Sequence, residues 1–504
     1  MAREGIRRKT PLFELASERG MSCIERATLD IMRDVGIVVD DKDARTLYAS
    51  IGCKVDESIK RVRFPEEVVL KYMAMCPSSY YLKGITAGDD IFFTGNGSRT
   101  YIGAGCAMNL YDIESDVIRR PTRKEFYDSM IILNNLENCD IYHSFPMFGF
   151  ERVPDCLAVI ESAAAKLRVG GKPQIEGSIT DEYIWTDAMA SALGVDCVQV
   201  VNSIAPQTYY KDVTDRLKFY AEHGNAIQIT PGPSKGLTCP ASNAGAVVAN
   251  NAESCAGIIY AQAIHPGTRI MSANMMMTPD MTSGVPAFGD VGFSIHETLL
   301  NQSWRRMQIP AISVSTSWTS SAVLDYQAGY EITAMIMAAV MSGSSAVMFM
   351  GALHAELSFS PIKAILDNDI AGIVKRFVEG IEINDETLAV DVIKEVGPCP
   401  NNFLDTEHTL ERWRDETYIP SSANRKSFKS WEREGRKNAA DIAQDKYNEI
   451  IRKGSFHRLT DHQESELEYI LNDARNYYRK KGMISDSEWT DLQKDLASDN
   501  YPYA

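Results

Sequence analysis

Short apolar runs alternate with longer segments of helical periodicity through the middle of the chain. The clearest runs are Ala311–Val314 and Ala346–Met350, which are rich in β-branched and large apolar residues. They are too short for buried helices and are bounded by Ser, Gly and Thr, so they predict buried strands. Between them, Tyr326–Met341 carries Ala, Met and Ile at helical spacing. This stretch therefore predicts a β-α-β unit with two parallel, neighbouring strands.

The same alternation recurs eight times. The predicted strands are 101–106, 141–145, 174–178, 198–203, 226–230, 269–274, 311–317 and 346–351. The segments after them that can form helices are 122–136, 155–167, 181–193, 213–223, 243–264, 292–306, 326–341 and 362–379. Eight alternating pairs are the number in a (β/α)8 barrel. The predicted fold class is therefore α/β, a (β/α)8 TIM barrel.

Two sections without this alternation flank the predicted barrel. Residues 1–97 combine helical periodicity with short apolar pairs separated by turn residues, which predicts an N-terminal helical and hairpin section. Residues 98–400 hold the barrel catalytic domain. Residues 401–504 are highly charged and helical in pattern, which predicts a C-terminal helical extension that wraps the barrel or contacts a partner.

Composition narrows the class of protein. The chain is 44% hydrophobic and 24% charged with a net charge of −16, which is ordinary for a globular protein and argues against a nucleic-acid partner. No apolar run approaches the ~20 residues that a membrane helix needs. The basic N-terminus lacks an apolar segment behind it, so we expect a cytoplasmic protein without a secretory signal. The ten cysteines and eight histidines show no metal-ligand spacing, so we expect no bound metal.

Candidate chemistry lies where strands end, because barrel active sites form at the C-terminal ends of strands. The residues at these ends are Cys106, Phe145, Glu176, Ser178, Ser203, Thr230, Asn274, Trp318 and His354. Trp318, His354 and the nearby Phe359 would place three rings at one opening. Trp has the strongest cation-attracting face, so this group suits a quaternary ammonium, and core packing is the alternative.

Two of these residues allow several roles. Glu176 is an acid inside a predicted strand, and buried carboxylates are rare unless paired. It is therefore either a functional anion or the partner of a basic residue. His354 is a general base, a donor to a substrate carboxylate or a core histidine. The residues thus indicate a barrel enzyme with an aromatic-lined mouth and leave its reaction open.

Several long segments resemble the trimethylamine:corrinoid protein methyltransferase family. They read ERATLDIMRDVGIVVDDKDARTLYASIGCKVDE, NNAESCAGIIYAQAIHPGTRI, LDYQAGYE, MSGSSAVMFMGALHAELSFSPIKAILDNDIAGIVKR, ETLAVDVIKEVG and NNFLDTEHT. The matches are collinear and run from about residue 20 to about residue 450. The resemblance implies a (β/α)8 barrel that passes a substrate methyl group to the Co(I) form of a corrinoid (cobalamin) carried by a separate partner protein.

One departure from the family pattern concerns the substrate. Trimethylamine-specific members carry pyrrolysine nine residues before the Gln of Gln-Ala-Gly, and that position is Trp318 here. The chain therefore resembles the non-pyrrolysine branch, whose members demethylate quaternary amines such as glycine betaine, proline betaine or carnitine. A quaternary ammonium leaves as a neutral tertiary amine, so the barrel has only to desolvate it and align one methyl group with cobalt.

The resemblance implies a substrate-binding set rather than acid–base catalysts. Trp318, Phe359 and either Tyr101 or Phe145 would form an aromatic cage, and His354 or backbone N–H groups would hold the substrate carboxylate. The full expected set is Trp318, His354, Phe359, Tyr101, Phe145, Glu176 and Asn274. The alternatives are a barrel lyase or hydrolase that uses Glu176 and His354 as acid and base, and a non-catalytic betaine-binding subunit. Self-association into a homo-oligomer is left open.

Overall fold

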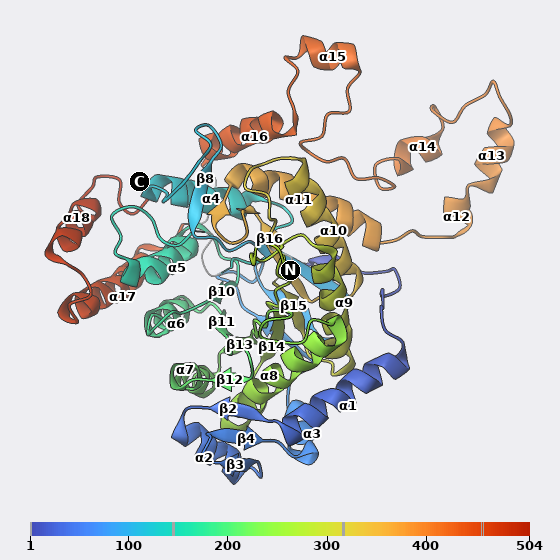
Figure 1. Cartoon of the computed structure of the whole chain (residues 1–504). Helices are drawn as coiled ribbons and strands as arrows, with labels where there is room; N and C mark the ends of the chain where they lie inside the picture. The colour runs from blue at the N-terminus through green and yellow to red at the C-terminus, as the bar shows by residue number, and fades with distance from the viewer. Residues whose placement is uncertain (1–2, 144–146, 315–317, 455, 457, 504) are drawn as a thin grey trace.

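A curled eight-stranded sheet lies at the centre of the molecule (Figure 1). The computed structural model describes residues 3–143, 147–314, 318–454, 456 and 458–503. The strand order is β1 (Ile6–Arg7), β7 (Arg99–Ala104), β16 (Ala346–Met350), β15 (Ala311–Ser313), β14 (Ile270–Asn274), β13 (Ala226–Ile229), β11 (Cys197–Val201) and β10 (Gln174–Glu176). All neighbours are parallel except β1, which is antiparallel to β7.

The strands are buried on both faces. Every residue of β13 and of β16 is buried, which is the pattern of parallel strands covered by helices. The register pairs Ile312 with Ala346 and Val347 with Ile102, so the β-α-β unit predicted from this part of the sequence is confirmed.

The segment predicted as the second strand lies between β7 and β10. Ile141 forms a single parallel bridge with Gly103, and Tyr142 forms one with Gln174. Each of the two residues thus forms one bridge to a neighbouring strand, and they do not form a regular strand themselves. The structure therefore establishes an α/β fold with a curled, mostly parallel sheet.

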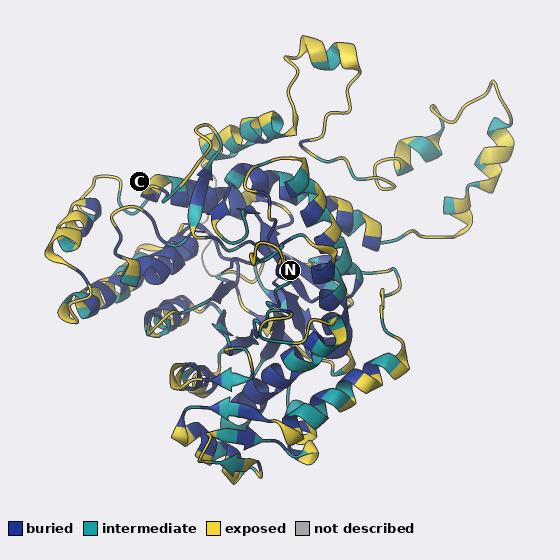
Figure 2. Cartoon of the chain, viewed as in Figure 1, coloured by how far each residue is buried: buried dark blue, intermediate teal, exposed yellow. Residues whose placement is uncertain are grey.

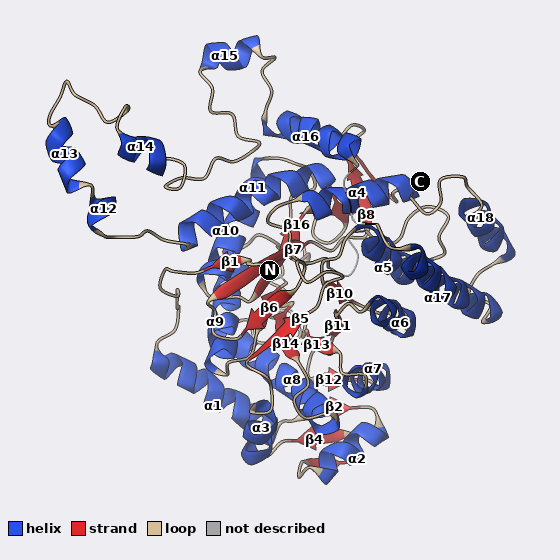
Figure 3. Ribbon diagram, turned by 180° about the vertical axis from the view of Figure 1, so that it is seen from behind, coloured by secondary structure: helices blue, strands red, loops and turns tan. Residues whose placement is uncertain are grey.

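Eight helices follow the strands and cover the sheet (Figure 3). They are α4 (Arg123–Asn135), α5 (Ala158–Val169), α6 (Tyr183–Leu193), α7 (Lys211–Glu222), α8 (Asn243–Ile264), α9 (Val291–Arg306), α10 (Tyr326–Met341) and α11 (Pro361–Val378). Side-chain caps fix where several begin: Thr122 caps α4 in a capping box, and Ser360 caps α11 ahead of Pro361. The prediction of eight helical segments is confirmed.

The N-terminal section packs on α8. It contains α1 (Glu18–Asp34), α2 (Lys42–Ser50), α3 (Glu66–Met73) and the strands β2 (Ile37–Val39), β3 (Lys54–Asp56) and β4 (Arg61–Arg63). The strand β12 (Thr208–Tyr209), which follows β11, adds to β2 and completes a small four-stranded sheet. The hairpin of β5 (Ser79–Leu82) and β6 (Ile91–Thr94) covers the amino end of the central sheet. There the Tyr80 hydroxyl donates to Ile270 O at 3.0 Å, and the Phe93 ring contacts Tyr101.

The C-terminal helices divide into two groups. The first comprises α16 (Ala439–Lys453), which packs on α4 and α11, α17 (Asp461–Lys480), which packs on α5 and α6, and the final helix α18 (Asp486–Leu496). The second comprises α12 (Asp385–Leu388), α13 (Val390–Val396), α14 (Glu407–Arg412) and α15 (Phe428–Arg433). This second group extends away from the body and is largely exposed (Figure 2). Across the described residues, every helix is too short or too polar to span a membrane.

Candidate active site

Three loops meet beyond the carboxyl ends of β7, β15 and β16. The backbone N–H of Met108 donates to Glu356 O at 2.9 Å, which joins the loop after β7 to the loop after β16. The N–H of Ala355 donates to Thr319 O at 2.8 Å, which adds the loop after β15. The same segments form a second sheet of β17 (Ala352–Leu353), β18 (Ser358–Phe359), β8 (Asn109–Asp112) and β9 (Val117–Arg119). These backbone bonds fix the three loops relative to one another.

Trp318 is enclosed within this group of loops. Its side chain is 1% exposed, and its indole packs edge-on against Phe288, with ring centroids 5.1 Å apart and an interplanar angle of 71°. The indole Nε1–H donates to Cys106 O at 3.4 Å. The sequence placed Trp318 after a strand end, and the structure adds Phe288, which comes from the long loop before α9.

A buried carboxylate of α10 holds the loop that carries Trp318. Glu331 accepts hydrogen bonds from the Thr319 hydroxyl and from the backbone N–H of Ser320, the latter at 2.9 Å. The Ser320 hydroxyl in turn donates to Phe288 O at 2.8 Å. Gly289 lies against Glu331, and a Cβ at that position would collide with the carboxyl group. Glu331 therefore fixes the position of both aromatic residues, Trp318 through its own loop and Phe288 through Ser320.

His354 lies in a strained turn next to the Trp318 loop. His354 and Ala355 have φ values of 50° and 59°, in the left-handed region that such residues seldom adopt. Strain of this kind often accompanies functional loops. The imidazole Nδ1 is buried and has no hydrogen-bond partner among the residues that the structure describes.

Phe359 lies in the core beneath these loops. It is fully buried, and its backbone pairs with Ala352 in the second sheet. A Cβ on Gly351 would collide with its ring, so glycine is required at the end of β16 for this packing. The ring that contacts Trp318 within the described residues is that of Phe288 rather than Phe359.

Of Tyr101, Phe145 and Asn274, the structure describes the side chain of Tyr101 alone, and that residue lies away from Trp318. Tyr101 lies at the amino end of the sheet, opposite Ala346 at the start of β16, and its hydroxyl accepts from Phe92 N–H at 2.9 Å. The position of Tyr101 in the sheet therefore separates it from the loops at the carboxyl end. Phe145 lies outside the described residues. Asn274 ends β14, and its side chain also lies outside what the structure describes.

Glu176 is the partner of a basic residue, one of the two roles that the sequence left open. Its carboxylate forms a buried ion pair with Lys166 of α5, whose ammonium also donates to His143 O at 3.1 Å. Burial raises the pKa of Glu176 to about 7, against the opposing effect of Lys166. Glu176 shares a small cleft with Leu167 of α5 and Ala190 of α6. It therefore lies between the sheet and its helices, where Lys166 links it to the segment that carries His143.

Two titratable residues near the site were not in the expected set. Glu356 is half-buried, burial raises the pKa of its carboxyl group, and its charge raises the pKa of the buried Cys106 thiol further. Among the described residues its carboxylate has no hydrogen-bond or ionic partner. His143 follows Tyr142, and burial lowers the pKa of its imidazole to about 3. The position of Glu356 after a strand was visible in the sequence, whereas its lack of a partner was not.

The described residues show no group of three His, Cys, Asp or Glu side chains that could hold a metal ion. The site is instead an aromatic pair, a half-buried carboxylate and an imidazole held by three loops. An aromatic face and a carboxylate both attract a cation, and an imidazole can donate a hydrogen bond to a carboxylate.

Comparison with known proteins places the chain among methyltransferases. The family model described as trimethylamine methyltransferase (MTTB) matches residues 1–476. Trimethylamine methyltransferase MttB of Methanosarcina barkeri is 27% identical over 456 residues, which cover 87% of this chain and 90% of that protein. Glycine betaine methyltransferase of Desulfitobacterium hafniense is 26% identical over 435 residues, which cover 84% and 89%. The crystal structure of Methanosarcina barkeri monomethylamine methyltransferase aligns over 93% of both chains with a TM-score of 0.47 and 13% identity. The chain belongs to the trimethylamine methyltransferase (MTTB) family.

Proposed function

We propose that this protein transfers a methyl group from a quaternary amine, such as glycine betaine, to the Co(I) corrinoid of a partner protein. Membership of the methyltransferase family supports the reaction type. The observation that carries the choice of substrate is the enclosed Trp318–Phe288 pair, in which Trp318 occupies the position where the resemblance places pyrrolysine in trimethylamine-specific members. The identities of 27% to a trimethylamine methyltransferase and of 26% to a glycine betaine methyltransferase are equal in effect, so the choice of substrate rests on Trp318.

We also propose that the sheet is a closed (β/α)8 barrel. The single parallel bridges of Ile141 to Gly103 and of Tyr142 to Gln174 support this, because they place one short segment between β7 and β10. That segment would be the second of eight strands, and α5 would be the helix that follows it. The barrel would occupy residues 98–400, between the section at 1–97 and the extension at 401–504.

The substrate cation would lie between the aromatic pair and Glu356. The face of an indole attracts an ammonium, and a carboxylate nearby adds to that attraction. The cationic charge is lost in the transition state, so very strong attraction in the ground state would slow the transfer. Glu356 is half-buried rather than fully desolvated, which moderates its field. His354 would donate to the carboxylate of a betaine.

The corrinoid, when bound, supplies the cobalt nucleophile. The residues of this chain bind the ammonium, orient one methyl group toward the mouth and exclude water from it. No proton has to be delivered to the leaving nitrogen, because a tertiary amine departs neutral. The proposed reaction therefore makes no demand for an acid–base pair beside Trp318.

A ring of exposed apolar side chains on the loops around the mouth supports docking of a macromolecular partner. These loops follow seven of the strands, and their exposed apolar residues are Met108, Ile179, Ile204, Leu237, Met281, Val285, Val323 and Leu357. Isolated exposed apolar residues are common, but such residues on consecutive loops around one opening favour an interaction surface. We assign this surface to the corrinoid protein.

The alternative of a lyase or hydrolase on a small anion has less support. It needs Glu176 and His354 as an acid–base pair. Glu176 instead pairs with Lys166 in the cleft between the sheet and its helices. A non-catalytic binding subunit would use the same aromatic pair, so the assay for cobalt methylation decides between it and the enzyme.

The decisive assay is anaerobic methylation of Co(I) cobalamin with glycine betaine, choline and trimethylamine as substrates. We expect turnover of quaternary amines and much slower turnover of trimethylamine. A cognate corrinoid protein should give transfer at a far lower cobalt concentration than free cobalamin requires. Faster turnover of trimethylamine would reject the proposed substrate class, and binding of betaine without any methylation would identify a binding subunit.

A further inference from the structure

The segment between α11 and α16 projects from the body as an arm, defined here as residues 381–438 (Figure 1). The stretch 416–422 anchors the arm on α11. The backbone N–H groups of Ser421 and Ser422 each donate to Asp369 at 2.7 Å, and the Tyr418 ring packs over Gly372. The anchor divides the arm into a first lobe, residues 381–415, and a second lobe, residues 423–438.

Both lobes expose large apolar side chains to solvent. In the first lobe Leu404 is 84% exposed, Ile383 70% and Leu410 68%. In the second lobe Phe428 is 68% exposed. Much of the arm is exposed, as the yellow ribbon of Figure 2 shows. A monomeric protein rarely leaves so many apolar groups together in water, so this surface is expected to be covered in an assembly.

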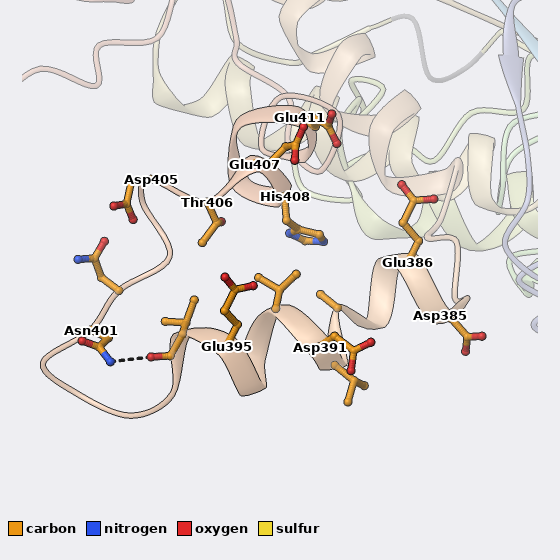
Figure 4. Close-up of a pocket in the computed structure, with 15 residues that line it drawn as sticks. Asp385, Glu386, Asp391, Glu395, Asn401, Asp405, Thr406, Glu407, His408 and Glu411 are labelled. Atoms are coloured by element: carbon orange, nitrogen blue, oxygen red, sulfur yellow. Dashed lines mark hydrogen bonds between the residues drawn. The ribbon is translucent and has the colours of Figure 1, made fainter.

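The two lobes carry opposite charge. The first lobe has nine acidic and three basic residues, whereas the second has six basic and two acidic residues. In the first lobe α12, α13 and α14 surround a hollow of about 1090 Å³ (Figure 4). Val392 and Val396 contribute apolar surface to it, and Glu395 and Glu411 are among its carboxylates. Neither Glu395 nor Glu411 forms an ion pair with any described residue.

Helix α15 of the second lobe has the complementary composition. Lys429 and Arg433 lie one turn apart on it and form no ion pair with a described residue. Phe428, beside Lys429, is an exposed apolar group that a hollow with valine surface could accept. Figures 1 and 3 both show α15 well separated from α13 and α14, so the two lobes of one chain do not cover each other.

We propose that two copies of this chain associate through their arms, with α15 of each copy in the acidic hollow of the other. Phe428 would pack against Val392 and Val396, and Lys429 and Arg433 would face Glu395 and Glu411. Each chain supplies both complementary surfaces, so a twofold arrangement satisfies both contacts at once. Charge complementarity would fix the pairing of the lobes, while the apolar groups would supply most of the affinity.

The experiment is sedimentation velocity of the full chain from nanomolar to micromolar concentration, without any partner protein. We expect a dimer. The double variants K429E/R433E and E395K/E411K each place like charges in contact, and each should weaken the dimer roughly 10-fold or more. An equimolar mixture of the two variants should restore association, because opposite charges then face each other in both contacts.

The matched control is K42E/K54E, which makes the same charge change on exposed residues of the N-terminal section. It should leave the dimer unchanged. Circular dichroism and thermal melting verify that each variant is folded. A monomer at every concentration, a dimer that neither reversal affects, or a mixture that does not recover would overturn the proposal. Association seen only after adding a corrinoid protein would also overturn it and assign the arm to that partner.

Discussion

At the scale of single residues, Trp318 and Glu356 differ in how far their surroundings satisfy them before any ligand binds. Trp318 is already desolvated and held against Phe288. A cation that contacts the indole therefore does not have to displace water from the ring. Glu356 is half-buried without a partner, and burial raises the pKa of its carboxyl group. An unpaired buried carboxyl group is unfavourable on its own and becomes favourable when a cation binds beside it.

We predict that Trp318→Leu weakens glycine betaine binding roughly 30-fold, because a desolvated cation–π contact is worth about 2 kcal/mol. Trp318→Phe should lie between the wild type and the Leu variant. Isothermal titration calorimetry on folded protein measures this effect. Trp304→Leu is the matched control, since Trp304 is also buried but lies in the core beside α8. If Trp318→Leu lowered only the melting temperature, as Trp304→Leu should, Trp318 would be a core residue.

A second prediction concerns pH. The ionised form of Glu356 attracts the substrate cation, and its pKa is raised in the free protein. Affinity for betaine should therefore increase as pH rises toward that pKa and become constant above it. Glu356→Gln should bind more weakly and lose this dependence, whereas Glu114→Gln, at an exposed position, should behave as wild type. An unchanged pH profile in Glu356→Gln would exclude Glu356 from the site.

At the scale of elements, helices α10 and α11 carry acidic residues in their interiors, and these residues hold neighbouring segments in place. Glu331 of α10 fixes the loop that carries Trp318. In α11, Asp367 accepts from Gly351 N–H at 2.8 Å, and Asp369 accepts from the anchor of the arm. Asp is unfavourable inside helices because its carboxylate competes for backbone hydrogen bonds. Here each acidic side chain instead accepts hydrogen bonds from a segment outside its own helix.

We predict that Glu331→Ala both destabilises the protein and weakens betaine binding. The change leaves the buried Thr319 hydroxyl without its acceptor, which costs about 1–3 kcal/mol, and also removes the acceptor of the Ser320 N–H at an exposed position. The loop would then hold Trp318 less firmly. Chemical denaturation and calorimetry measure the two effects. Glu297→Ala on α9 is a comparison from a neighbouring helix: we expect it to lower stability and change affinity less. If Glu331→Ala left the affinity for betaine unaltered, Glu331 would have no role in positioning Trp318.

The sequence predicts a feature well where interactions between residues close in the chain determine it, and poorly where contacts between distant segments do. The alternation of apolar runs and helical periodicity located the helices from α4 to α11, because each covers one face of the sheet. Phe288 was missed because it lies in a long loop where no periodicity applies. The Lys166 partner of Glu176 was missed because helix spacing does not reveal contacts with a strand. Tyr101 was grouped with Trp318 although it lies opposite the start of β16, and position along a strand decides which end of the sheet a side chain reaches.

At the scale of the whole molecule, the C-terminal extension is joined to the sheet-covering helices through buried charges. Arg475 of α17 donates to Glu161 of α5 at 2.8 Å, and both residues are 1% exposed. Arg123 of α4 donates to Asp495 of α18. Helices separated by more than 300 residues therefore depend on each other for charge compensation.

We predict that Arg475→Met destabilises the protein by about 3–5 kcal/mol, because the Glu161 carboxylate would remain buried without its main partner. The double variant Arg475→Met/Glu161→Met should recover most of that loss, since two apolar side chains can replace a buried pair. Urea unfolding of the single and double variants measures the coupling. Additive losses in the double variant would show that the two residues contribute independently.

The hairpin of β5 and β6 has a consequence for the order of events during turnover. Tyr80 and Phe93 cover the amino end of the sheet, so under the proposed function the amine would enter through the loop-lined end. A macromolecule seated on those loops would close the same route. The amine should therefore enter before the partner docks, and the demethylated product should leave only after it departs. Steady-state kinetics would then show a compulsory order, with excess partner protein inhibiting by trapping the product.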